Sequence, residues 1–275
     1  MDTYQAIIYG IIHGFSEFLP IDSLAHIWAV PEILGWPAAP QILLGGLTLG
    51  GLLAVLVYFR HDWLSMISCS LQVFVYRKKP MTLDERMPFF ILLASIPPAI
   101  AWFYGREYVE GFELTSYRVA GLLALFGLPL AFSDYWSRKN KALPDWNWID
   151  AIVAGILQCL FFVPGCGRMT AVLTGACLRN YNREAAAKFA FFSAAPILAG
   201  LTFFRLKGID FHAPAPTDGM TWLAFGIAGL VSFLTSLLAI GGFMKNVMQK
   251  GYGRYAIYRL IAAGGLALTF WIKNR

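Results

Sequence analysis

Two short polar strings interrupt apolar stretches of this chain, and both carry side chains that can do chemistry. The first places ionisable and hydroxyl groups along residues 13–26: His13, Glu17, Asp22, Ser23 and His26. The second, along residues 158–170, combines glycines with a cation and a hydroxyl: Gly165, Gly167, Arg168 and Thr170. Each string follows an apolar half-span and is broken by a proline. Ionisable groups at membrane depth are expensive, so they are candidate functional residues by default.

The first string can supply a nucleophile and proton-transfer groups. His13 and Glu17 are spaced i, i+4, so they share one face of a helix. Asp22, Ser23 and His26 follow in a turn and at the start of a returning helix, which either of the first two could cap. Ser23 could attack phosphorus while His26 or Glu17 handles the proton. The alternative is structural, a capped turn in which a buried Glu–His pair holds the two halves together.

The second string favours an anion. Glycines at 165 and 167 leave backbone N–H groups exposed where a helix begins, and a helix N-terminus attracts negative charge. Arg168 adds a planar, bidentate donor for phosphate. Pro-Gly-x-Gly-Arg is a weak motif alone, but facing the first string it predicts a phosphate-ester site. Beside a diphosphate, Glu17 could also bind a divalent cation, Mg²⁺ or Ca²⁺.

Composition places the chain in a membrane. Of 275 residues, 58% are hydrophobic and 14% are charged, whereas soluble proteins average about 25% charged. The net charge of +6 comes from basic residues in short loops between apolar runs. That distribution is typical of topology signals and not of a nucleic-acid surface. We therefore expect a polytopic membrane protein with no nucleic-acid partner.

Six apolar runs are long enough to cross a bilayer, which takes about 20 residues: 41–59, 87–105, 117–134, 184–204, 220–243 and 254–272. Segments 1–35 and 148–178 instead consist of two apolar halves around a polar string, and neither half can span alone. We expect both to be re-entrant helix hairpins whose non-helical tips face protein or water. Segment 61–85 is partly apolar and is either an interfacial helix or a plain loop.

This order predicts an all-α protein with a single membrane domain built from two inverted repeats, residues 1–135 and 148–275. Each repeat is one re-entrant helix hairpin plus three transmembrane helices. Weak symmetry supports the repeat, because Gly10-Ile-Ile-His13 matches Gly155-Ile-Leu-Gln158. Inverted repeats with broken helices place a binding site near the midplane. Basic residues gather on one side of the membrane, which is therefore cytoplasmic, and both termini lie outside together with a few cations such as Arg205.

The two strings resemble the motifs of the undecaprenyl-diphosphate phosphatases, bacterial membrane enzymes linked to bacitracin resistance. The first family motif, Glu/Gln-x-x-x-Glu-Phe-Leu-Pro-Ile/Val-Ser-Ser-Thr-Gly-His, is matched at Glu17, Phe18, Leu19, Pro20, Ser23 and His26. The second, Pro-Gly-x-Ser-Arg-Ser-x-x-Thr, is matched at Pro164, Gly165 and Arg168. The resemblance covers essentially the whole chain and implies two hairpins and six spans. It assigns catalysis to Glu17, Ser23, His26 and Arg168.

Departures from these motifs lie beside the matched residues. His13 replaces the first acid, and Asp22 replaces a serine. Gly167 and Met169 replace both serines around Arg168, so phosphate-facing hydroxyls are lost. Thr170 can restore one hydroxyl. We expect five residues to bind substrate without reacting with it: His13, Asp22, Gly165, Gly167 and Thr170.

The leading hypothesis is a phosphatase of the bacterial inner membrane. It would hydrolyse undecaprenyl or another polyprenyl diphosphate to the monophosphate, which recycles the lipid carrier of cell-wall synthesis. The alternative is a transporter or flippase of polyprenyl phosphate or another anionic lipid. Inverted repeats suit alternating access, and lost hydroxyls fit binding without hydrolysis. A homodimer is a possible assembly.

Overall fold

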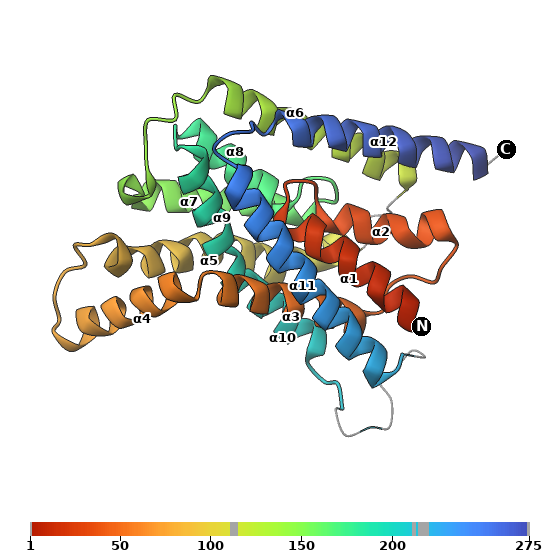
Figure 1. Cartoon of the computed structure of the whole chain (residues 1–275), viewed down its shortest axis with the longest axis horizontal. Coiled ribbons are helices and arrows are strands. Elements are labelled where there is room, and N and C mark those ends of the chain that lie inside the picture. The colour runs from red at the N-terminus through yellow and green to blue at the C-terminus, as the bar shows by residue number, and fades with distance from the viewer. Residues whose placement is uncertain (1, 111–114, 211–212, 214–219, 274–275) are drawn as a thin grey trace.

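Every regular element in the described part of the computed structural model is a helix (Figure 1). The structure describes residues 2–110, 115–210, 213 and 220–273, with the backbone alone for residues 106–110. The α-helices are α1 Thr3–Phe18, α2 Ser23–Leu34, α3 Gln41–Tyr58, α4 Arg60–Val75, α5 Leu83–Glu110, α6 Ser116–Trp136, α7 Trp148–Gln158, α8 Arg168–Leu178, α9 Arg183–Phe192, α10 Ala194–Leu206, α11 Trp222–Asn246 and α12 Gly253–Lys273. Two short 3₁₀ turns, Leu143–Asp145 and Cys159–Phe162, flank α7.

The polytopic membrane architecture predicted from hydropathy is confirmed. Within the described residues, six helical segments are long and apolar enough to cross a bilayer: Gln41–Tyr58, Leu83–Gly105, Ser116–Trp136, Arg183–Leu206, Trp222–Asn246 and Gly253–Lys273. Each coincides with one of the predicted apolar runs. The fourth of these segments contains α9 and α10, which meet at Ser193. In Figure 1 both chain ends lie to the right, and the connection from α4 to α5 lies to the left.

The segments predicted as hairpins are helices broken at the polar strings. Helix α1 ends at Phe18, and α2 begins at Ser23 after a turn that contains Pro20. Asp22 caps α2, because its Oδ2 accepts the N–H of Ala25 at 3.1 Å. Helix α7 passes into a 3₁₀ turn at Cys159, and α8 begins at Arg168. The two breaks therefore leave residues 19–22 and 163–167, in the middle of the polar strings, outside helices, so their backbone N–H and C=O groups can contact other parts of the protein.

Small residues allow α1, α3 and α11 to pack closely. A side chain at Gly14 would collide with Thr235 on α11, and one at Gly50 would collide with the Gly229 carbonyl. Small residues at helix contacts let backbones approach within a membrane. The other strong pairings are α5 with α7, α6 with α12, and α3 with α10. These packings fix where the two hairpins lie relative to each other.

Segment 61–85 contains a helix, so the plain-loop alternative is wrong over most of it. Helix α4 spans Arg60–Val75 and packs against α5. Leu64, Ile67, Leu71 and Phe74 follow helical spacing, and all four are exposed. An exposed apolar stripe on a short helix fits the predicted interfacial position.

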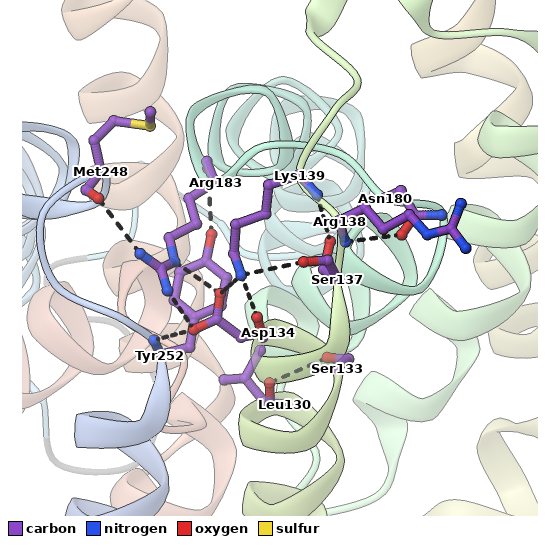
Figure 2. Close-up of polar contacts among 10 residues, drawn as sticks. All are labelled: Leu130, Ser133, Asp134, Ser137, Arg138, Lys139, Asn180, Arg183, Met248 and Tyr252. Carbon is purple, nitrogen blue, oxygen red and sulfur yellow. Dashed lines mark hydrogen bonds and ion pairs between the residues drawn. The ribbon is translucent and has the colours of Figure 1, made fainter.

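A network of charges joins α6, α9 and the segment before α12 (Figure 2). The Asp134 carboxylate accepts two hydrogen bonds from Arg183, at 2.7 and 2.9 Å, and one from the Tyr252 N–H at 2.9 Å. Lys139 adds a second cation at 3.6 Å. Paired donors and acceptors of this kind stabilise a partly buried charge. The network therefore fixes the ends of three helices, and none of its members belongs to the two polar strings.

Candidate active site

The shortest side-chain contact within the first string joins Ser23 to Glu17. Ser23 Oγ donates to Glu17 Oε2 at 2.6 Å. Glu17 lies in the last turn of α1 and Ser23 is the first residue of α2, so the break between the helices brings them together. A carboxylate that accepts a hydrogen bond from a hydroxyl can take its proton when the oxygen attacks. This geometry is the one that a serine nucleophile and its general base require.

Arg168, from the second hairpin, holds the other oxygen of Glu17. Its Nε and Nη2 lie 3.4 and 3.3 Å from Glu17 Oε1, while Nη1 donates to the Ala190 carbonyl at 2.7 Å. The side chain is only 2% exposed. A guanidinium fixed at two places cannot rotate freely. In this structure Arg168 therefore orients Glu17 toward Ser23, and three of the four residues predicted to be catalytic lie together.

The loop predicted to bind phosphate is filled by Asp22. The Asp22 carboxylate is buried and accepts the Gly165 N–H at 2.5 Å. A Cβ added at Gly167, whose φ is +73°, would lie 3.0 Å from both Cα and Cβ of Asp22. Asp22 and Gly167 each stand where the family motif has a serine, so these two departures fit against one another. The Gly165 N–H, expected to face a substrate phosphate, donates to the Asp22 carboxylate instead.

Arg259 ties together the tips of both hairpins. It is fully buried, and its guanidinium donates to Thr170 Oγ1 at 2.9 Å and to the Cys166 carbonyl at 3.2 Å. It also contacts the carbonyls of Gly165 and Pro20. Thr170, expected to face substrate, is thus a partner of Arg259. The sequence assigned Arg259 no role, although an arginine inside an apolar span is the signal that marks such a residue.

His26 lines a different cavity from Ser23. Its Nδ1 lies 2.6 Å from the Asp22 carbonyl, which can only accept, so we infer that Nδ1 carries the proton. Its Nε2 lies 2.8 Å from the Tyr258 hydroxyl, which then donates. His26 and Tyr258 line a cavity of about 330 Å³ beside α12, and Ser23 is not among its walls. Glu17 is therefore better placed than His26 to accept the Ser23 proton.

Glu17 and Ser23 line a cavity of about 200 Å³. Its polar lining residues are His13, Glu17, Ser23, Thr48 and Arg205. The other lining residues are apolar or aromatic, among them Leu44, Phe161 and Leu201. An apolar cavity of about 280 Å³ shares Phe161 and Leu201 with it. The arrangement suits a ligand that has an ionic head and a hydrocarbon tail.

His13 and Arg205 both line this cavity, although only His13 was predicted to belong to the site. His13 was expected in the site, and its Nδ1 lies 2.9 Å from Ser232 Oγ, which itself donates to the Leu47 carbonyl. Ser232 has one proton, so His13 Nδ1 is the donor in that contact. Arg205 was counted only as an outer-side cation, yet it lines the cavity. Its position within span Arg183–Leu206, and not in the loop beyond, is the signal that sequence reasoning missed.

Comparison with known proteins agrees with the motifs. The profile of the family described as Bacitracin resistance protein BacA matches residues 6–265. The chain belongs to this family. It is 34% identical over 275 residues to the undecaprenyl-diphosphatase of Idiomarina loihiensis, covering 98% of this chain and 100% of that protein. It is 32% identical over 274 residues to the undecaprenyl-diphosphatase of Moorella thermoacetica, covering 100% of both chains. The protein of the same name from Alcanivorax borkumensis is 33% identical over 274 residues, covering 99% of this chain and 100% of that protein.

The donor set of this BacA family member offers little to a metal ion. Of the described residues that line the cavity, Glu17 alone carries a carboxylate, and both of its oxygens have protein partners. Across the described part of the chain, no group of three or more His, Cys, Asp and Glu side chains could hold an ion. Mg²⁺ can be bound by one carboxylate together with substrate phosphates. A cation at Glu17 therefore stays a prediction that depends on the substrate.

Replacing Asp22 with alanine should destabilise this BacA family protein. The N–H groups of Gly165 and Ala25 would lose a buried acceptor, at about 1–3 kcal/mol each. The positive φ of 77° at Asp22 also disfavours alanine. Asp22→Asn keeps an acceptor oxygen and tolerates this φ, so it should lose much less. Thermal unfolding of both variants in detergent is the measurement, and equal losses would show that the acceptor is unimportant.

Proposed function

We propose that this chain hydrolyses undecaprenyl diphosphate, or a similar polyprenyl diphosphate, to the monophosphate. The observation that carries the proposal is the Ser23–Glu17 contact of 2.6 Å in a cavity whose lining residues are mostly apolar. The relatives' name, undecaprenyl-diphosphatase, supports the same substrate. The product would return to the pool of lipid carrier used in cell-wall synthesis, and the protein would work in the bacterial inner membrane.

In the proposed reaction, Ser23 Oγ attacks the terminal phosphorus and Glu17 accepts the hydroxyl proton. A serine–phosphorus bond forms while the bond from that phosphorus to the bridging oxygen breaks. The electron pair leaves on the prenyl phosphate, to which Glu17 passes its proton. Water then attacks the phosphoserine, giving a proton to Glu17. Glu17 returns it to Ser23 Oγ as the serine–phosphorus bond breaks and inorganic phosphate departs.

The lipid tail would occupy the apolar walls. Leu44, Phe161 and Leu201 line the cavity beside Ser23, and the last two also line the neighbouring apolar cavity. Buried apolar area contributes roughly 25 cal/mol per Å², so several isoprene units held there would add strongly to affinity. The charged head would then lie at Glu17 and Ser23. Short soluble diphosphates should bind more weakly than prenylated ones.

The finer architecture also belongs to this proposal. Helix α1 packs on α11, and α7 packs on α5, so the first helix of each predicted repeat, residues 1–135 and 148–275, contacts the second span of the other. This reciprocal pairing supports two inverted repeats. Re-entrant hairpins, a cytoplasmic α4, termini on the outside and a homodimer remain predictions. The transporter hypothesis gains no observation of its own from the described residues, so hydrolysis is the better supported function.

Release of phosphate from undecaprenyl diphosphate by the purified protein in detergent tests this proposal. We expect turnover that requires Ser23 and is little affected by Ser68→Ala, a control on an exposed serine of α4. If no prenyl diphosphate yields phosphate, hydrolysis is wrong. Movement of a labelled prenyl phosphate across liposomes containing the same protein would then favour the transporter.

Replacing Arg168 with lysine should remove most of this activity. A single ammonium cannot keep both the Glu17 and the Ala190 contacts, so Glu17 would shift relative to Ser23. A misplacement of about 1 Å can reduce a rate about 10²-fold. We expect kcat to fall with KM little changed, measured on undecaprenyl diphosphate. A raised KM at normal kcat would place Arg168 on the substrate instead, and near-normal turnover would remove it from the site.

A further inference from the structure

Arg205 is a cation directed into the cavity that holds Ser23. It lies on α10 and is partly buried, and its Nη1 is 3.4 Å from the Leu44 carbonyl. That is a long, weak hydrogen bond. In the described part of the chain, no carboxylate lies within ion-pair distance of its guanidinium. An arginine has five N–H donors, so most of those of Arg205 are available to a ligand.

The other donors that could bind an anion near the tips of the two hairpins are already engaged. Arg168 contacts Glu17 and a carbonyl, and Arg259 contacts the carbonyls of the hairpin tips. The Gly165 N–H has Asp22 as its acceptor. None of these donors lines the cavity beside Ser23, whereas Arg205 does. A phosphate that enters this cavity therefore meets Arg205 as its guanidinium partner.

The two phosphates of the substrate would occupy different places in the cavity. The phosphate under attack must lie at Ser23, so the one attached to the lipid lies nearer to the apolar walls. The Arg205 guanidinium contacts the carbonyl of Leu44, and Leu201 lies one turn earlier on α10; both leucines are apolar lining residues of this cavity. We propose that Arg205 binds the lipid-linked phosphate, through the paired hydrogen bonds that a planar guanidinium makes. This inference rests on the proposed function.

Such a contact would act in catalysis as well as in binding. The bond that breaks leaves its electron pair on the lipid-linked phosphate, so negative charge grows there in the transition state. A fixed guanidinium stabilises growing charge more than it stabilises the bound substrate. Arg205 would therefore favour departure of the prenyl phosphate. The same contact would hold the product, so a prenyl monophosphate should inhibit through Arg205.

Replacing Arg205 with glutamine should weaken binding of phosphate-bearing ligands. The probes are farnesyl phosphate, a methylene-bridged farnesyl diphosphate analogue that cannot be hydrolysed, and farnesol, which carries no phosphate. Loss of paired bonds to a charged group predicts roughly 10- to 100-fold weaker binding of the first two. Farnesol should bind as before, and kcat on undecaprenyl diphosphate should also fall. Arg205→Lys, which keeps the charge but not the fork, should give an intermediate loss.

Lys207→Gln is the matched control, because it removes one exposed cation two residues further along the chain. It should leave every probe unaffected, so general loss of positive charge is separated from loss of Arg205. Weaker farnesol binding, or a large drop in unfolding temperature for Arg205→Gln with normal binding in Arg205→Lys, would show a structural role and overturn the inference.

The experiments distinguish a failure of the Arg205 inference from a failure of the proposed function. If the protein releases phosphate but Arg205→Gln binds the diphosphate analogue as tightly as the native chain, Arg205 is not a phosphate ligand and hydrolysis still stands. If no prenyl diphosphate is hydrolysed but the variant still loses analogue binding at least 10-fold, hydrolysis is wrong and the Arg205 site stands.

Discussion

Replacing Ser23 with alanine should reduce phosphate release from undecaprenyl diphosphate on the order of 10³-fold or more. The change removes the hydroxyl that donates to Glu17 Oε2, and with it the proposed nucleophile. Binding should survive, because the walls of the cavity and Arg205 are unchanged. Single-turnover phosphate release, together with binding of the methylene-bridged farnesyl analogue, measures both effects.

The decisive comparison is between the two measurements on Ser23→Ala. A catalytic serine predicts lost turnover at nearly normal affinity. If turnover falls only a few-fold, water attacks the diphosphate directly and Ser23 only positions it. Failure to trap a phosphoserine in the native protein under acid quench would support that second mechanism and contradict the covalent one.

Replacing Glu17 with glutamine should reduce kcat by roughly 10²- to 10⁴-fold, the usual contribution of a general base. Glutamine can still accept a hydrogen bond from Ser23, but it cannot take up the proton. The neutral side chain also leaves Arg168 buried without its partner, which costs about 3–5 kcal/mol of stability. The rate in detergent should therefore be measured together with the unfolding temperature.

A double variant separates the two consequences of Glu17→Gln. Adding Arg168→Gln removes the unpaired charge, so much of the lost stability should return. Activity should remain low, because the base is still absent. Recovery of activity in the double variant would mean that Glu17 contributes only by neutralising Arg168, and the assignment of the base would be wrong.

The spans and the Ser23–Glu17 pair could be predicted from sequence because both depend on local features. A lipid-spanning helix must bury about 20 apolar residues in succession, so hydropathy located all six spans. Glu17 and Ser23 flank one proline-containing turn, so any hairpin at that turn brings them close together. The i, i+4 spacing likewise put His13 and Glu17 on one face, and both line the same cavity.

The contacts between the two hairpins depend on tertiary packing and could not be predicted from the sequence. The glycines around 165 predicted an anion site, but Asp22 from the other hairpin reaches that loop and takes its N–H. His26 follows Ser23 by three residues, yet Tyr258 on α12 holds it beside a different cavity.

By itself, the sequence determined that this chain is a polytopic membrane protein with two broken-helix segments, and it predicted which residues could carry its chemistry. The tertiary structure decided which of those residues meet. Arg205 shows why, because a cation at the end of a span can face water, lipid headgroups or the protein interior with the same local sequence. It is the tertiary packing, chiefly of α10 against α3, that directs Arg205 to the cavity beside Ser23. Local periodicity sets a side chain's position along a helix, and the neighbouring helices set what that side chain touches.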